Sequence, residues 1–189
     1  MDAIEMLTTR RSCRSYKTEQ ISKQELDTIL QCGLHAPSGS NKQLVKIIVV
    51  QDAAKISFLS QLNARIMQGH ADPFYGAPTL CLIVAPEDSG YDANSASALN
   101  PIKDGSLVIG AMQDGAFALG IGSCWINRCK EMLELPEGKE FMHSLGLDGY
   151  VGIGCCILGY PDKAPADKTI KEGRVVYADW RGGEVNSCR

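Results

Sequence analysis

The chain has 189 residues, of which 44% are hydrophobic and 22% are charged, and its formal net charge is −3 at pH 7. This length and composition predict one globular domain with a sizeable core, and the isoelectric point of about 5.6 argues against a protein drawn to nucleic acid or anionic membrane. The N-terminus, Met1–Glu5, carries acids and no apolar core, and no apolar run approaches the roughly 20 residues that span a bilayer. We therefore expect a cytoplasmic protein without a signal peptide.

Hydrophobic spacing predicts alternating helices and strands in the first half of the chain. In order they are a short helix at 2–9, a helix from 22 to about 35, a strand at 45–50, a helix at 52–67 and a strand at 79–85. Ser22 and Glu25 form a capping box at the start of the second helix. Residues 36–43 have the composition of a loop, and residues 86–102 are polar without a period.

A central helix at 103–119 dominates the second half. Its many glycines and alanines predict close packing, because glycine costs an exposed helix about 1 kcal/mol. The predicted elements that follow are a strand at 122–126, a short helix at 128–134, a helix from Pro136, a strand at 150–159 and a last short strand at 175–177. The polar tail that holds this last strand and Trp180 has the composition of a segment that docks on another surface.

One stretch, Arg10–Tyr16, concentrates three arginines and two serines within seven residues of an acidic chain. Guanidinium groups make bidentate hydrogen bonds to phosphate oxygens, and hydroxyl groups add to them. These residue types predict a site for one compact anion. The alternative is a solvated basic turn after a short helix, and the seven residues alone do not decide between the two.

Other familiar motifs are absent. The sequence has no dinucleotide-binding glycine fingerprint, no P-loop and no nucleophile elbow. Its cysteines and histidines lack zinc spacing, so we expect no metal site. Among the eight cysteines, Cys81, Cys155 and Cys156 lie in apolar runs and should be core residues. A core role is favoured for Cys124 as well, whereas a redox or nucleophilic role of Cys124 or Cys129 stays open.

Four stretches jointly resemble the FMN-dependent nitroreductase family, in the order and spacing of that family. They are 10–16 (RRSCRSY), 36–43 (APSGSNKQ), 118–126 (ALGIGSCWI) and 157–161 (ILGYP). Each stretch is a weak signal by itself, and together they span most of the chain. The resemblance favours a phosphate-binding role for the arginines over a solvated turn.

The resemblance implies a fold and an assembly. The fold would be an α+β sandwich with a mostly antiparallel central sheet flanked by helices. Residues 1–160 would form the FMN-binding domain, and residues 161–189 would be a tail of the same domain that wraps the partner subunit, exchanging tails between subunits. The protein would be a homodimer with FMN at the subunit interface.

The resemblance also implies roles for individual residues in binding FMN. Arg10, Arg11 and Ser12 would hold the phosphate, helped by Lys171 or Arg174 of the tail. Arg14 would lie near the N1–O2 edge of the flavin. The other contacts would come from the partner's loop (Pro37, Ser38, Gly39 and Asn41) and from backbone near flavin N5 at the end of a strand (Ile126, Asn127 and Arg128).

The implied activity is an oxidoreductase that works in two half-reactions. NADH or NADPH would reduce the flavin, and a flat acceptor such as a nitroaromatic or a quinone would oxidise it, with no protein side chain as catalyst. Three other interpretations stay open: a dehalogenase or flavin-modifying enzyme on the same scaffold, a non-catalytic FMN-binding protein, and a structural dimer without flavin. The sequence identifies neither the electron donor nor the acceptor, and no substrate lid is recognisable in residues 86–102.

Overall fold

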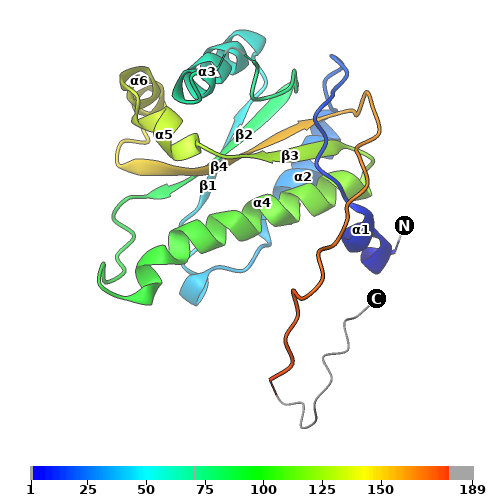
Figure 1. The fold of residues 1–189 in the computed structure, drawn as a ribbon. Helices are drawn as coiled ribbons and strands as arrows, with labels where there is room; N and C mark the ends of the chain where they lie inside the picture. The colour runs from blue at the N-terminus through cyan, green and yellow to red at the C-terminus, as the bar shows by residue number, and fades with distance from the viewer. Residues whose placement is uncertain (1, 70, 179–189) are drawn as a thin grey trace.

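The computed structural model describes residues 2–69 and 71–178, and its centre is a four-stranded antiparallel sheet (Figure 1). The strands have the spatial order β1-β2-β4-β3. Their bounds are β1 Lys46–Val50, β2 Thr79–Pro86, β3 Gly122–Ile126 and β4 Tyr150–Gly159. The implied α+β fold with an antiparallel sheet is therefore confirmed.

Helices cover both faces of this sheet, with α3, α5 and α6 on one face and α2 and α4 on the other (Figure 1). Their bounds are α1 Ala3–Thr9, α2 Lys23–Leu34, α3 Ala53–Ile66, α4 Asn100–Ala118, α5 Cys129–Glu134 and α6 Pro136–Ser144. Two 3₁₀ turns, Gly39–Asn41 and Ala96–Leu99, lie in the loops. The capping box of Ser22 and Glu25 is present at the start of α2, as predicted.

The alternation of side chains along β2 divides the core into two clusters. Leu80 and Leu82 face the layer of α3, α5 and α6, whereas Cys81 and Ile83 face α2 and α4. Successive strand residues point to opposite faces, so a strand buried on both faces reads as a continuous apolar run. The three cysteines predicted to be core residues are fully buried, and burial raises the pKa of the Cys81 thiol to about 12.

Close packing explains two of the glycines in α4. A Cβ on Gly105 would lie 2.5 Å from Cδ1 of Ile153 on β4, and a Cβ on Gly115 would lie 2.6 Å from Sγ of Cys32 on α2. Gly110 differs from both, because nothing in the described chain lies within 4 Å of its Cβ position. Packing on the sheet and on α2 thus explains Gly105 and Gly115, whereas Gly110 lies on a face of α4 that no described residue covers.

Two sequence predictions were wrong in detail. Residues 86–102 are not wholly irregular, because α4 begins at Asn100 with Pro101 in its first turn, a position that proline favours. Residues 175–177 form no strand, because they lie beside none of the four strands of the described sheet. Trp180, predicted to dock with the tail, lies outside the described residues. Within residues 2–69 and 71–178, no helix is long and apolar enough to cross a membrane.

The capping box at the start of α2 yields a stability prediction. Ser22→Ala removes the hydroxyl that accepts from the Glu25 N–H and donates to the Glu25 carboxylate, and it leaves only the Ser22 backbone N–H as a donor to that carboxylate. We expect a loss of about 1 kcal/mol in the free energy of unfolding, measured with urea. Thr28→Ala in the same helix is the control, because it removes only a bond to the Gln24 carbonyl within the helix. Equal losses in the two variants would contradict the prediction.

Candidate functional site

The arginine stretch lies along the outer edge of β3 and is not a free turn. The Cys13 N–H donates to the Ser123 carbonyl at 2.8 Å, and a Cβ on Gly122 would come within 2.8 Å of Cys13 Sγ. Tyr16 then pairs with Pro161 in an isolated β-bridge, just beyond β4. These backbone contacts fix the stretch on the sheet and set the directions of its arginines.

Two of the arginines present unused hydrogen-bonding capacity. Arg10 forms an ion pair through Nε with Asp114 of α4 at 3.1 Å, and no described residue pairs with its two terminal nitrogens. Arg11 turns Nη1 onto the carbonyls of Thr8 and Arg10, and its buried Nε has no partner among the described residues. A buried donor without a partner is costly, so this arrangement suits an anionic acceptor that the chain itself does not supply.

Ser12 and Arg14 complete the cluster. Ser12 is half-buried and Arg14 is exposed. Burial raises the pKa of the Cys124 thiol, and Arg14 and Ser12 offset only part of that rise. A thiol that stays protonated is a poor nucleophile, and both Cys124 and Cys129 are almost completely buried. This burial favours core roles for the two cysteines.

The loop at 38–43 has an unusual backbone. Ser40, Asn41 and Gln43 all have φ near +50°, a region that residues with a Cβ seldom adopt. The Gln43 N–H donates to Ser38 Oγ at 3.1 Å, closing the loop on itself. Such a conformation persists only where surrounding contacts hold it.

Contacts from two other segments hold this loop at Gly39. The Gly39 N–H donates to both carboxylate oxygens of Asp104, at 3.0 and 3.1 Å, and Asp104 is only 5% exposed on α4. The Gly39 carbonyl accepts from the Tyr91 hydroxyl at 2.8 Å. Lys42 lies over the Tyr91 ring, with 3.7 Å between its Nζ and the ring centroid. Residues 86–99 therefore support the loop.

The end of β3 forms a third part of the site. Ile126 is buried, Asn127 is exposed, and Arg128 has a left-handed backbone with φ 65°. The Asn127 carbonyl accepts from the buried side chain of Asn63 on α3 at 3.3 Å. This contact fixes the orientation of the peptide group that follows the strand.

The structure brings some of the predicted residues together and keeps others apart. The arginines lie beside β3, and Arg10 contacts α4 at Asp114, whereas the loop at 37–41 contacts α4 at Asp104. These two carboxylates are ten residues apart in one helix, which corresponds to about 15 Å. Lys171 and Arg174 are exposed in a tail that leaves the sheet past α1 (Figure 1).

Sequence reasoning missed the residues that position the site. Asp104, Asp114, Tyr91 and Asn63 carried no motif. Only the helical spacing could have pointed to Asp104, because it shares the apolar face of α4 with Val108 and Met112. A carboxylate on such a face is buried, and a buried carboxylate needs a hydrogen-bonding partner.

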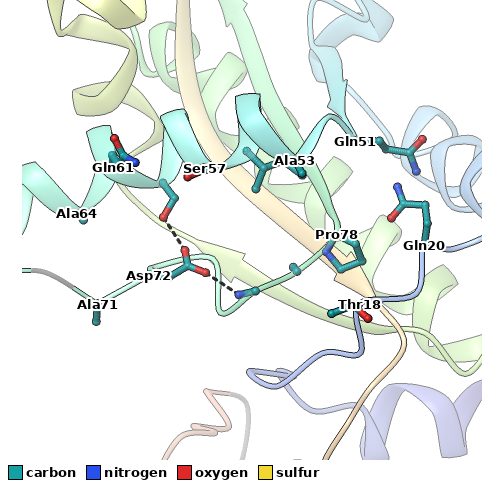
Figure 2. Close-up of a pocket in the computed structure, with 14 residues that line it drawn as sticks. Thr18, Gln20, Gln51, Ala53, Ser57, Gln61, Ala64, Ala71, Asp72 and Pro78 are labelled. Carbon is teal, nitrogen blue, oxygen red and sulfur yellow. Dashed lines mark hydrogen bonds between the residues drawn. The ribbon is translucent and has the colours of Figure 1, made fainter.

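A hollow of about 660 Å³ lies away from the arginines, between α3 and residues 71–78 (Figure 2). Gln20 and Gln51 point toward each other at one end, and both donate to Thr79 Oγ1. Asp72 is occupied by the Ser60 hydroxyl and by two backbone N–H groups. Among the described residues that line it, none is a Lys or Arg that could hold a phosphate. In the described part of the chain, no group of three or more His, Cys, Asp or Glu could hold a metal ion.

Comparison with known proteins points to one family. The model of the nitroreductase family matches residues 7–160. The chain is 29% identical to the FMN reductase [NAD(P)H] of Bacillus subtilis, over 92% of this chain and 70% of that protein. It is 25% identical to the NADPH-flavin oxidoreductase of Vibrio harveyi, over 98% and 76% of the two chains. A Bacteroides fragilis nitroreductase crystallised with bound FMN superposes with a TM-score of 0.82, at 28% identity, over 95% of this chain and all of that one.

The Asp104 anchor yields a prediction about the loop. Asp104→Ala removes the acceptor of the Gly39 N–H, so we expect amide hydrogen exchange in residues 38–43 to become about fivefold faster, as loss of about 1 kcal/mol implies. Asp104→Asn retains a carbonyl oxygen and should keep most of the protection. Exchange that is the same in Asp104→Ala and in the wild type would mean that the loop holds its own conformation.

Proposed function

This chain belongs to the nitroreductase family, and on that basis we propose that it is an FMN-dependent oxidoreductase driven by NADH or NADPH. The observation that carries the proposal is the pair of arginines beside β3, whose guanidinium groups keep unpaired donors in a chain of net negative charge. The names of the relatives, an FMN reductase [NAD(P)H] and an NADPH-flavin oxidoreductase, support the same chemistry. A flat acceptor such as a nitroaromatic or a quinone is the proposed substrate class.

The arginine cluster fits the phosphate of FMN. Asp114 accepts a hydrogen bond from Nε of the Arg10 guanidinium. The two terminal nitrogens, which have no partner among the described residues, can then donate two charge-assisted hydrogen bonds to the same anion. Arg11 adds a buried Nε without a partner, and Ser12 adds a hydroxyl. In this proposal these three residues bind the phosphate, so the cofactor is anchored at the edge of β3.

Other residues of the chain orient and tune the cofactor. Bound FMN supplies the redox chemistry, in which it takes electrons from the nicotinamide and passes them to the acceptor. Arg14, exposed next to the phosphate cluster, places a cation at the N1–O2 edge, where it favours negative charge on the flavin. Backbone groups of Ile126 and Asn127 meet the ring at the end of β3.

Helix α4 supports a homodimer with FMN between the subunits. Ile102 and Leu107 are 55% and 48% exposed, and no described residue lies within 4 Å of the Cβ position of Gly110. An antiparallel pair of α4 helices about a twofold axis would bury this face. It would also bring the Asp104 end of one helix opposite the Asp114 end of the other. Pro37, Ser38, Gly39 and Asn41 of one copy would then cover the flavin held by the arginines of its partner.

The tail is assigned to the partner subunit in the same proposal. Residues 162–178 are exposed along their whole length, and the tail runs away from its own sheet (Figure 1). Ile170, Val175 and Val176 are apolar side chains without a surface to cover them in one copy. Wrapped around the partner, the tail would bury them and could bring Lys171 or Arg174 to the phosphate. Residues 1–160 then form the domain, and 161–189 its exchanged tail.

The absorption spectrum tests the proposed function. Purified protein should show two flavin bands in the visible range, and anaerobic addition of NADH or NADPH should bleach them. Bands that neither nicotinamide bleaches would favour a non-catalytic FMN-binding protein or a flavin enzyme of another class. A colourless protein that takes up no added FMN would contradict the proposal as a whole.

The phosphate cluster makes a second prediction. Arg10→Ala should weaken FMN binding by roughly 10- to 100-fold, because hydrogen bonds to charged groups contribute about 1.5–3 kcal/mol. Binding is measured by titrating apoprotein with FMN and following flavin fluorescence. Arg65→Ala is the matched control, since Arg65 pairs with Glu137 between α3 and α6, on the other face of the sheet. Equal affinity of the two variants would refute the role of Arg10.

A further inference from the structure

Asn63 is an amide buried among apolar side chains, and its contacts do not satisfy it. It lies fully buried in α3, in the layer that holds Leu59 and Leu62. Its Nδ2 donates to the Asn127 carbonyl at 3.3 Å, and its Oδ1 has no hydrogen-bond partner among the described residues. A carbonyl can only accept, so this contact determines which way the amide is turned. Because the unpaired Oδ1 destabilises the fold, packing does not explain an asparagine here.

The contact fixes the peptide group between Asn127 and Arg128. The peptide is trans, so its C=O and N–H groups point in opposite directions. Since Asn63 holds the carbonyl toward α3, the Arg128 N–H points away from α3. No described residue accepts a hydrogen bond from this N–H. The Arg128 N–H, just after the end of β3, is therefore a hydrogen-bond donor without a described partner, and its direction is fixed.

The sheet restrains the backbone that follows this peptide. A Cβ on Gly152 of β4 would lie 2.5 Å from the carbonyl carbon of Cys129, so the backbone after Arg128 packs directly on β4. Arg128 itself has φ 65°, which is unfavourable for a residue with a Cβ. Backbone strain of this kind persists where the surroundings over-determine the conformation, and it occurs often at functional sites.

We infer that Asn63 is a positioning residue that holds the Arg128 N–H toward the N5 edge of the flavin. This inference rests on the proposed function, which places the end of β3 against that edge. The N5 atom of oxidised flavin accepts a hydrogen bond, whereas the protonated N5 of reduced flavin cannot. A fixed N–H donor therefore favours the oxidised form. By orienting the Arg128 N–H, Asn63 lowers the midpoint potential of the flavin.

The test compares three full-length proteins loaded with FMN: the wild type, Asn63→Leu and Ser60→Ala. Asn63→Leu removes both the donor and the unpaired acceptor at similar volume. Ser60→Ala removes another side-chain hydrogen bond of the same helix, one that leads to Asp72. The midpoint potential is measured anaerobically against a reference dye. Amide exchange of Met132, which donates to the Arg128 carbonyl at 3.0 Å, is measured with and without FMN.

We expect Asn63→Leu to raise the ratio of reduced to oxidised flavin at a fixed potential by about tenfold, or ~30 mV for a two-electron couple. Exchange of the Met132 amide should become several-fold faster, with or without FMN, and Ser60→Ala should change neither quantity. Asn63→Met is a second apolar variant that gives the same result if leucine prevents folding. Both readouts differ from a loss of activity, which a purely structural role of Asn63 would also cause.

Two results would overturn the inference alone. One is a folded, FMN-loaded Asn63→Leu or Asn63→Met protein with the potential of the wild type. The other is a Ser60→Ala protein whose potential shifts as far as that of Asn63→Leu. A wild type that takes up no FMN would overturn the proposed function and, with it, the effect on the flavin. Exchange of the Met132 amide would still show whether Asn63 restrains the peptide.

Discussion

The burial of α4 against the sheet is the constraint on which the arrangement of the site depends. Gly105 lets the helix touch Ile153 of β4, and Gly115 lets it touch α2, so its axis is fixed by contacts without spare volume. Asp104 and Asp114 are then held at two positions about 15 Å apart. One orients the loop at 38–43, and the other orients Arg10. A shift of this helix would move both halves of the proposed cofactor site together.

The three parts of the site are stabilised in the same way, by a polar side chain that restrains a backbone or a guanidinium group. Asp104 holds the Gly39 N–H, Asp114 holds the Arg10 guanidinium, and Asn63 holds the Asn127 carbonyl. None of these three needs to touch the cofactor. They pre-organise the groups that would, which reduces the ordering cost of binding. In the proposed reaction, where the flavin carries the chemistry, such positioning would be the main contribution that the protein makes.

Much of the fold could be predicted from the sequence, because its signals are local. The period of apolar residues located the helices and strands, and the capping box located the start of α2. The beginning of α4 was missed because its first turn, Asn100 to Lys103, holds a proline and two polar residues and so shows no helical period of apolar residues. The prediction of a strand at 175–177 was wrong because a β-branched pair forms a strand only beside another strand, and none of the four described strands lies there.

The sequence by itself determined the elements, the hydrophobic core and the cluster of Arg10, Arg11, Ser12 and Arg14, since these depend on neighbours in the chain. Only the tertiary structure decided what those residues can do. Arg10 meets Asp114 across 104 positions, Gly39 meets Asp104 across 65, and Asn63 meets Asn127 across 64. Such pairs have no local pattern, because they form only once the helices have packed on the sheet. The same physical reason keeps the loop at 37–41 apart from the arginines in one chain, because the two segments contact α4 about 15 Å apart. In the proposed homodimer, a second copy would bring them together.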